Sequence, residues 1–428
     1  MMPVKRILRL LFWLVAGLMT GTTCLPAQVQ ANYEEEKVPA FALPDPLRNG
    51  DGLMINDSNE WVHSRRPELL QLFEREVYGK LPDETLTPDY TLLENGIALG
   101  GKAVRKQIRL TFENNGRRLD LLLLVYLPAG MDKAPVFVGL NFYGNQTITA
   151  DPAVLLTTSW VPNNKTFGIE ANQATETSRG VRISRWPLEK IIDAGYGLAT
   201  MYYGDIDPDR DDFTDGVHPL FYRDGQTRPD ADEWGAIGAW AWGLMCIMDY
   251  LQQDSAIDAG RVVLMGHSRL GKAALWAGAQ DRRYAIVISN DSGCGGAALS
   301  RRKFGETVQI INTAFPHWFC SHFKDYNDHE NDLPVDQHEL IALMAPRPVY
   351  IASAQEDQWA DPKGEYLSGW YASPVYRLFG LQGLESATPP AVNDPVMHDI
   401  GYHMRTGGHD VKDYDWEQFI NFANHHLK

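Results

Sequence analysis

Short apolar runs alternate along the chain with longer stretches of helical periodicity. Continuous apolar runs predict strands buried on both faces of a sheet, and a period near 3.6 residues predicts helices. The predicted strands are residues 136–141, 197–203, 262–265, 285–289 and 348–354. The predicted helices are residues 61–78, 234–251, 273–279, 337–344 and 416–426. This alternation indicates an α/β three-layer sandwich, with a mostly parallel central sheet and helices on both faces.

Two segments depart from this alternation. Residues 103–112 and 119–127 predict two strands joined around Asn114-Asn115-Gly116, a combination typical of a β-hairpin. The hairpin gives the sheet an antiparallel N-terminal edge. Residues 147–185 show little periodicity, and we expect a loop insertion near the functional site.

The first 31 residues have the pattern of a secretory signal. Three basic residues precede an apolar run over residues 10–19, and residues 29–31 form a small-residue cleavage site. The apolar run is too short to span a membrane. Thr23 is bulkier than the residue usually found before a lipidated cysteine, which argues against a lipid anchor at Cys24. The sequence therefore predicts a secreted or periplasmic protein with no membrane attachment after signal removal.

Composition indicates one large globular domain over residues 32–428. No Ser/Pro/Gly tract, charge block or repeat divides this part of the chain. The formal charge of −16 becomes −19 once the three cations of the signal are removed, which argues against binding nucleic acid or an anionic membrane. Of the remaining cysteines, Cys246, Cys294 and Cys320, one pair such as Cys294–Cys320 could form a disulfide. We expect a monomer.

No metal or organic cofactor is expected. The acidic stretch over residues 204–212 lacks the glycine and terminal glutamate of a calcium-binding EF-hand loop, and it predicts a solvated acidic loop. The chain has no H-E-x-x-H, C-x-x-C, G-x-G-x-x-G or Walker pattern. His317 and His322 have no metal-ligand spacing, and His317-Trp318 is expected to line a pocket or pack in the core.

The strongest candidate for chemistry is the segment between the strand 262–265 and the helix 273–279. Gly266, Ser268 and Gly271 form a tight turn there, with the hydroxyl at its apex. Such an elbow exposes a serine at the carboxyl end of a buried strand, and the following helix directs its N–H groups at a developing anion. The second glycine comes one residue later than in the usual G-x-S-x-G, and a Gly-Ser turn without chemistry also fits the bare pattern. The flanking strand and helix favour a nucleophile.

A nucleophilic serine requires a histidine base and an orienting carboxylate. In the α/β-hydrolase fold, whose layout this chain has, the order along the chain is serine, acid, histidine. His409 lies in a glycine-rich loop before the last helix and is the favoured base, with His398 and His403 as alternatives. The candidate acids are Asp357, Asp291 and, more weakly, Glu356, each placed after a predicted late strand.

With these residues in view, the sequence resembles the glucuronoyl esterases of carbohydrate esterase family 15, particularly the bacterial ones. The resemblance covers most of the chain after the signal. It runs through residues 140–145, 239–243, 266–272, 290–296, 315–319 and 356–362. It implies hydrolysis of the ester that joins 4-O-methyl-glucuronic acid branches of glucuronoxylan to lignin alcohols. It also implies an acyl-enzyme on Ser268, proton transfer by His409, and help from Arg269 in holding the oxyanion.

The resemblance further implies a sugar-binding set. Lys272 lies one helical turn beyond Ser268 and would bond sugar hydroxyls, and Glu306 and Trp359 match the family's sugar-binding glutamate and tryptophan. A carboxylate accepts hydrogen bonds from a diol, and an indole offers a flat face and an N–H donor. His317 is expected in the same pocket.

Two positions depart from the fungal members, which have glutamate where Asp291 stands and cysteine where His267 stands. Because Asp291 is shorter, we predict that Asp357 is the main orienting acid and that Asp291 assists it. Two alternatives remain for the whole protein. One is another esterase of this fold, such as an acetyl-xylan esterase, and the other is a non-catalytic glycan-binding protein. A binder has no use for Ser268 and His409, which favours an enzyme.

Overall fold

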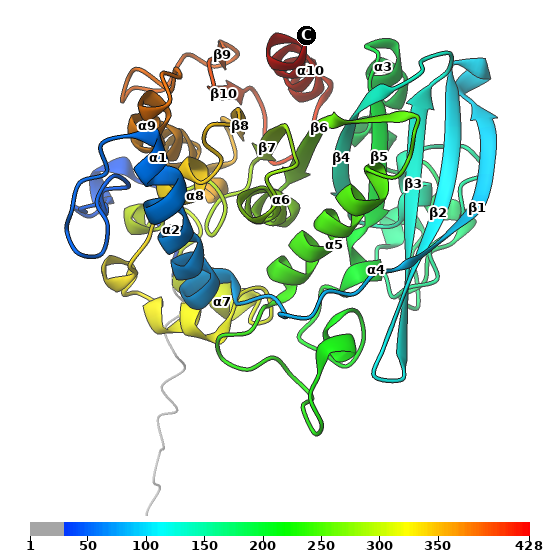
Figure 1. Ribbon diagram of the computed structural model, residues 1–428, viewed down its shortest axis with the longest axis horizontal. Helices are drawn as coiled ribbons and strands as arrows, with labels where there is room; N and C mark the ends of the chain where they lie inside the picture. Colours follow the sequence, from blue (N-terminus) through cyan, green and yellow to red (C-terminus); the bar gives the residue numbers. More distant parts are fainter. Residues whose placement is uncertain (1–29) are drawn as a thin grey trace, which may run out of the picture. The chain divides into compact units, whose positions relative to one another are not determined.

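The computed structural model describes residues 30–428 (Figure 1). The predicted export signal lies outside the described residues, except for its last two positions. Within this range no helix is both long and apolar enough to cross a membrane.

In the described part of the chain, ten strands form one sheet in the order β1-β2-β3-β5-β4-β6-β7-β8-β10-β9. The strands are β1 (Asp89–Ala98), β2 (Ala103–Asn114), β3 (Arg117–Pro128), β4 (Ala134–Asn141), β5 (Gly197–Tyr202), β6 (Ile257–His267), β7 (Ile286–Asn290), β8 (Val349–Ala354), β9 (Val396–Met397) and β10 (Ile400–Arg405). The neighbouring strands β5, β4, β6, β7, β8 and β10 pair in parallel. At one edge of the sheet, β1, β2 and β3 pair antiparallel with one another and β3 pairs antiparallel with β5, and at the other edge β9 pairs antiparallel with β10. The predicted parallel sheet with an antiparallel edge is confirmed.

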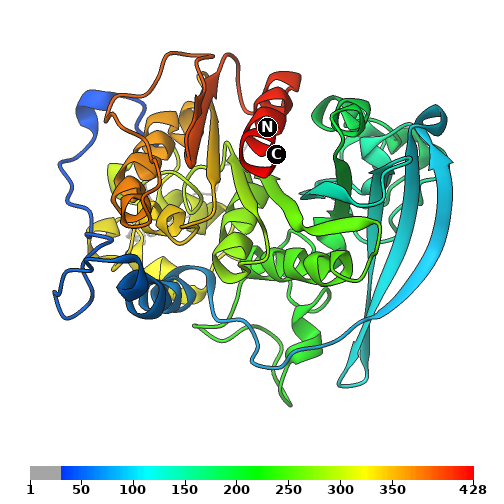
Figure 2. The same cartoon turned by 45° about the horizontal axis from the view of Figure 1, so that its top comes forward.

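Helices cover both faces of this sheet, as Figures 1 and 2 show. They are α1 (Ser58–Glu60), α2 (Arg66–Phe73), α3 (Leu188–Asp193), α4 (Tyr203–Ile206), α5 (Ala236–Leu251), α6 (Arg269–Gln280), α7 (Val308–Ala314), α8 (Gln337–Ala342), α9 (Pro362–Leu378) and α10 (Asp413–Leu427). Single π-helical turns extend α2 at both ends, over Trp61–Arg65 and Glu74–Tyr78. One apolar cluster joins α2, α5, α6, α8 and α9 to one face, and a second joins α3 and α10 to the other.

Strand β6 shows how the central strands serve both layers. Val262 and Leu264 belong to the first cluster, and the alternate residues Val263 and Met265 belong to the second. Alternation of side chains across a strand buries the run on both faces, which is why it is continuously apolar. Helix α6 packs close to the sheet: a Cβ at Gly278 would lie 2.6 Å from a methyl group of Val287. The sheet and α6 therefore fix the position of the turn between them.

Several elements were not predicted, among them β1, α9 and β10. All but the last side chain of β1 are exposed or half-buried, so this edge strand has no apolar run. Helix α9 contains Pro374 and buries the polar residues Glu365 and Ser368, which obscures its periodicity. Strand β10 buries His403 and Arg405, and both are accommodated because Asp415 of α10 accepts hydrogen bonds from them. In α9 and β10, partners on other segments stabilise buried polar residues that look unsuited to the element.

The three cysteines of the described chain, Cys246, Cys294 and Cys320, are free and buried. The disulfide that the sequence allowed between Cys294 and Cys320 is therefore absent from the described residues. Apolar packing, rather than a covalent link, surrounds these thiols.

Candidate active site

Ser268 occupies a strained turn between the end of β6 and the start of α6. Its backbone has φ +59° and ψ −131°, in a region that side-chain-bearing residues rarely adopt. The turn is tight because a Cβ at Gly266 would lie 2.0 Å from the Leu270 carbonyl oxygen. A Cβ at Gly271 would lie 3.0 Å from Ser292 and 3.1 Å from the Gly266 carbonyl oxygen. The spacing of the two glycines therefore follows from close backbone contacts in the elbow.

The side chains of Ser268, His409 and Asp357 form a hydrogen-bonded row. The Ser268 hydroxyl lies 2.9 Å from His409 Nε2, and His409 Nδ1 donates to Asp357 Oδ2 at 2.6 Å. Asp357 follows β8 and is buried, whereas the His409 side chain, in the loop between β10 and α10, is 41% exposed. A hydroxyl, an imidazole and a carboxylate in this order can activate the hydroxyl as a nucleophile.

The alternative histidines lie elsewhere. His403 is buried on β10, where it donates to Asp415 at 2.8 Å and accepts from the Tyr350 hydroxyl at 2.9 Å. His398 Nδ1 donates to the Gly383 carbonyl oxygen at 3.0 Å. Neither forms a hydrogen bond with Ser268.

Asp291 lies near His409 without forming a hydrogen bond to it. Its Oδ2 accepts from Asn290 Nδ2 at 3.0 Å and from Arg405 Nη2 at 3.3 Å. Both donors also reach the carbonyl oxygen of Asp410, the residue after His409. Burial raises the pKa of Asp291 well above its usual value, and the nearby acids Glu365 and Asp357 add to this. Asp291 is thus linked to the loop that carries His409 through the side chains of Asn290 and Arg405.

The third candidate acid, Glu356, is exposed and contributes only its backbone N–H, which donates to the Gly407 carbonyl oxygen. His267, next to the nucleophile, packs its ring 4.6 Å from the ring of His409. Its Nδ1 accepts from Asn290 at 2.9 Å, and burial lowers its pKa well below the usual value. His267 is therefore a neutral neighbour of His409.

A cavity of about 320 Å³ opens beside Ser268. It is lined by Ser268, Arg269, Lys272, Asp291, Ser292, Gly293, Glu306, Phe315, Trp318, Asp357, Trp359, Ala360 and His409. The structure thus brings together every favoured candidate except His317, and it leaves out the alternatives His398, His403 and Glu356. A cavity of this size fits a sugar ring with its substituents.

The wall beyond the nucleophile carries an oppositely charged pair. Lys272 Nζ donates to the Ser292 carbonyl oxygen at 2.5 Å and lies 3.8 Å from Glu306 Oε2, and both side chains are buried. Burial lowers the pKa of Lys272 and raises that of Glu306, and the attraction between the two opposes both shifts. Trp359, 42% exposed, stands at the mouth of the same cavity. These groups offer donors, acceptors and a flat apolar face to a ligand.

The acidic stretch over residues 204–212 is not the solvated loop that the sequence predicted. Asp205 and Asp207 are buried, and the side chain of Asp209 is nearly covered. Asp205 accepts from the Thr157 hydroxyl at 2.8 Å, and Asp207 bonds to His218 at 3.1 Å. His317 does not line the cavity, because its Nε2 donates to Asp209 at 2.8 Å. The structure therefore places His317 behind the lining residues, against Asp209, and its sugar-binding role stays a prediction.

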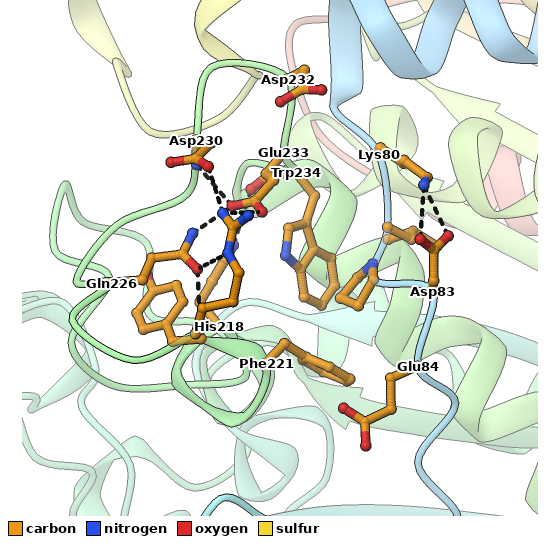
Figure 3. A pocket seen from close by; sticks show the side chains of 14 residues that line it. Lys80, Asp83, Glu84, His218, Phe221, Gln226, Asp230, Asp232, Glu233 and Trp234 are labelled. Atoms are coloured by element: carbon orange, nitrogen blue, oxygen red, sulfur yellow. Dashed lines mark hydrogen bonds and ion pairs between the residues drawn. The ribbon is translucent and has the colours of Figure 1, made fainter.

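A second depression, of about 350 Å³, lies where η9 (His218–Phe221) meets the segment before β1 (Figure 3). Most of its charged side chains pair with one another: Arg223 pairs with Asp230 and Glu233, and Lys80 pairs with Asp83. The residues that line it include no serine or cysteine beside a histidine. This depression therefore offers no activated nucleophile of the kind found beside Ser268.

Comparison with known proteins finds relatives that are similar to this chain in sequence and in structure. A family model described as "Glucuronyl esterase, fungi" matches residues 221–380. The carbohydrate esterase MZ0003, from an unknown prokaryotic organism, is 53% identical over 397 residues that cover 92% of each chain. A promiscuous CE15 esterase from a marine bacterial metagenome has a similar structure, with 52% identity, a TM-score of 0.88, and coverage of 93% of this chain and 100% of the other. The glucuronoyl esterase from Solibacter usitatus is 48% identical with a TM-score of 0.87, covering 92% and 100%.

The loop after β7, which forms one side of the cavity, is held by Glu365 of α9. Glu365 Oε1 accepts from the N–H groups of Ser292 at 2.7 Å and Gly293 at 2.9 Å, and Oε2 contacts the Ser353 hydroxyl at 2.6 Å. Burial raises the pKa of Glu365 from 4.5 to about 8, although these hydrogen bonds oppose the shift. The folded protein therefore holds a proton on Glu365 at neutral pH.

We predict that Glu365→Gln removes a pH dependence of stability. An unfolded chain loses this proton near pH 4.5 and the folded one near pH 8, so the free energy of unfolding falls between these values as pH rises. Glutamine keeps the contacts without a titratable proton, so between pH 5 and pH 8.5 the variant should gain about 1–3 kcal/mol relative to the parent. Urea unfolding at several pH values measures this, with exposed Glu356→Gln as control. Parallel stability curves for parent and Glu365→Gln would contradict the assignment.

Proposed function

Since the chain belongs to carbohydrate esterase family 15, we propose that it hydrolyses esters of 4-O-methyl-glucuronic acid in glucuronoxylan, including those to lignin alcohols. The family consists of carboxylic ester hydrolases, and this chain is one. The observation that carries the proposal is the row Ser268–His409–Asp357 at the mouth of a cavity that also presents Lys272 and Glu306. A nucleophile beside a set of sugar-compatible groups suits the ester of a uronic acid.

Acylation begins with attack of Ser268 Oγ on the ester carbonyl carbon. His409 Nε2 takes the hydroxyl proton, and the Asp357 carboxylate stabilises the imidazolium that forms. Negative charge develops on the carbonyl oxygen, where the first N–H groups of α6 and the Arg269 guanidinium are the available donors. Collapse of the intermediate breaks the bond to the alcohol oxygen, and His409 gives that oxygen its proton.

Deacylation repeats these steps with water. His409 removes a proton from the water as the water oxygen attacks the acyl carbon on Ser268. The second tetrahedral intermediate releases the serine oxygen, which recovers the proton from His409. The products are a free uronate and an alcohol, and the enzyme returns to its starting state.

Recognition of the uronate falls to groups beyond the nucleophile. Lys272 donates to ring hydroxyls, Glu306 accepts from them, and Trp359 presents its indole at the mouth of the cavity. An ester that lacks the sugar leaves Lys272 and Glu306 without ligand partners. The discrimination between uronate esters and simple acetates therefore resides in this pair.

We also propose that residues 1–31 direct export, that residues 32–428 act as one catalytic domain, and that the enzyme works as a monomer without a cofactor. The charge pattern and cleavage site at the start of the sequence support export. A secreted or periplasmic location is consistent with a polymeric plant substrate.

The nucleophile is tested first. Ser268→Ala should keep the fold but lower turnover of a benzyl or methyl glucuronate ester at least ~10³-fold, because the covalent route is lost. The matched control is Ser255→Ala, the same change at an exposed turn before β6. If Ser268→Ala retains near-normal activity, the serine-esterase mechanism is wrong. If the parent cleaves only acetates, the glucuronate assignment fails while the mechanism stands.

Two carboxylates are compared next. Asp357→Asn should lower turnover up to ~10⁴-fold, since His409 loses the partner that fixes its tautomer. Asp291→Asn should cost roughly tenfold, because Asp291 reaches His409 only through Arg405 and Asn290. Steady-state kinetics of both single variants and of the double variant decide the assignment. A larger loss in Asp291→Asn would reverse the two roles, and collapse only in the double variant would mean that they share one role.

Recognition is tested by substrate comparison. Glu306→Ala should reduce kcat/KM for benzyl glucuronate by roughly 10- to 100-fold, as expected when a hydrogen-bonding partner of a bound hydroxyl is removed, and change hydrolysis of a nitrophenyl acetate by less than about threefold. Glu356→Ala, an exposed glutamate near the His409 loop, is the matched control. Equal losses on both substrates would show that Glu306 supports catalysis or structure instead of binding the sugar.

A further inference from the structure

The segment after β5 brings Asp209 against Arg269, the residue that follows the nucleophile. Asp209 Oδ2 accepts from Arg269 Nη1 and, at 3.1 Å, from the Tyr203 hydroxyl. Asp209 Oδ1 accepts from His317 Nε2 and Trp318 Nε1, both at 2.8 Å. Four donors on separate side chains therefore converge on one carboxylate.

This carboxylate is buried and yet remains ionised. Its side chain is 6% exposed. Burial alone would raise the pKa of Asp209, but the hydrogen bonds from His317 and Trp318 and the charge of Arg269 lower it to about 2. Because both oxygens are engaged by donors from different segments, the position of the charge is fixed by the surrounding fold.

Arg269 is constrained on its other sides by aromatic rings. Its guanidinium carbon lies 4.7 Å from the ring centre of Trp318, 5.3 Å from that of Phe315 and 5.9 Å from that of Phe142. Its one hydrogen bond to another described residue is the one to Asp209. The three rings restrict the space that the guanidinium can occupy, and the hydrogen bond to Asp209 fixes its position within that space. Arg269 also lines the cavity with Ser268.

We propose that Asp209 is a positioning residue of the reaction, which holds the Arg269 guanidinium where the oxyanion of the tetrahedral intermediate forms. The inference rests on the proposed function, because it requires Arg269 to act on that oxyanion. A cation aids this step only if it is already in place when charge develops. Without Asp209, the Arg269 side chain has no polar partner in the described structure to hold it there.

The test is a double-mutant cycle on kcat. Asp209→Asn should lower kcat about 10- to 100-fold with KM changed less than about threefold, since the lost interaction belongs to the transition state. The loss should be equal on benzyl glucuronate and nitrophenyl acetate, because both esters form an oxyanion. In an Arg269→Met background, adding Asp209→Asn should lower kcat by less than about threefold, because the effect of Asp209 acts through Arg269.

The matched control is Asp205→Asn, a buried aspartate of the same segment whose partner is Thr157 and which does not line the cavity. It should keep kcat near the parent value. If Asp209→Asn does not fold, Asp209→Glu keeps the charge, displaces the carboxylate by one methylene, and enters the same cycle. The proposal would be overturned if Asp209→Asn lowered kcat as much in the Arg269→Met background as in the parent, or if Asp209→Asn raised KM and left kcat unchanged. If the parent lacks activity on glucuronate esters, only the proposed substrate fails, because the acetate arm still tests Asp209.

Discussion

The left-handed backbone of Ser268 is the constraint on which the site depends. A serine in that conformation is strained, and it persists because β6 and α6 are both anchored in apolar layers on either side of the turn. The glycines at 266 and 271 let the two backbones approach within van der Waals distance. Once the hydroxyl is fixed, the loops after β8 and β10 need only bring Asp357 and His409 to it.

Around this turn, buried charged side chains lie next to side chains of opposite charge. Asp209 is matched by Arg269, Lys272 lies near Glu306, and Asp291 contacts Arg405. An unpaired buried charge would cost several kcal/mol, so each member depends on its partner. The result is a site in which polar groups keep their places before substrate arrives, the condition under which fixed charges contribute to catalysis.

Sequence patterns predicted the parallel core, the hairpin edge, and the row of Ser268, Asp357 and His409, because these depend on local signals: apolar runs, a glycine-framed serine, and polar residues just after strands. They failed where a residue is explained only by a distant partner. In the sequence, Asp209 is one of several acids in a polar stretch. Its role is visible only in the structure, where His317 and Trp318, about a hundred positions later in the chain, donate hydrogen bonds to it. Strand β10 was missed because its buried His403 and Arg405 look unsuited to a core until Asp415, Tyr350 and Asp291, which lie on other segments, bond to them.

The exposure of His409 and Trp359 has a consequence for polymers. Both stand at the rim with about two-fifths of their surface in solvent, so the reacting ester meets the enzyme at an open edge and not at the end of a tunnel. A side branch enters such a site while the main chain that bears it stays outside. If the substrate is the branched polysaccharide proposed above, we expect the rate of attack to follow the density of branches, with no need to find a chain end.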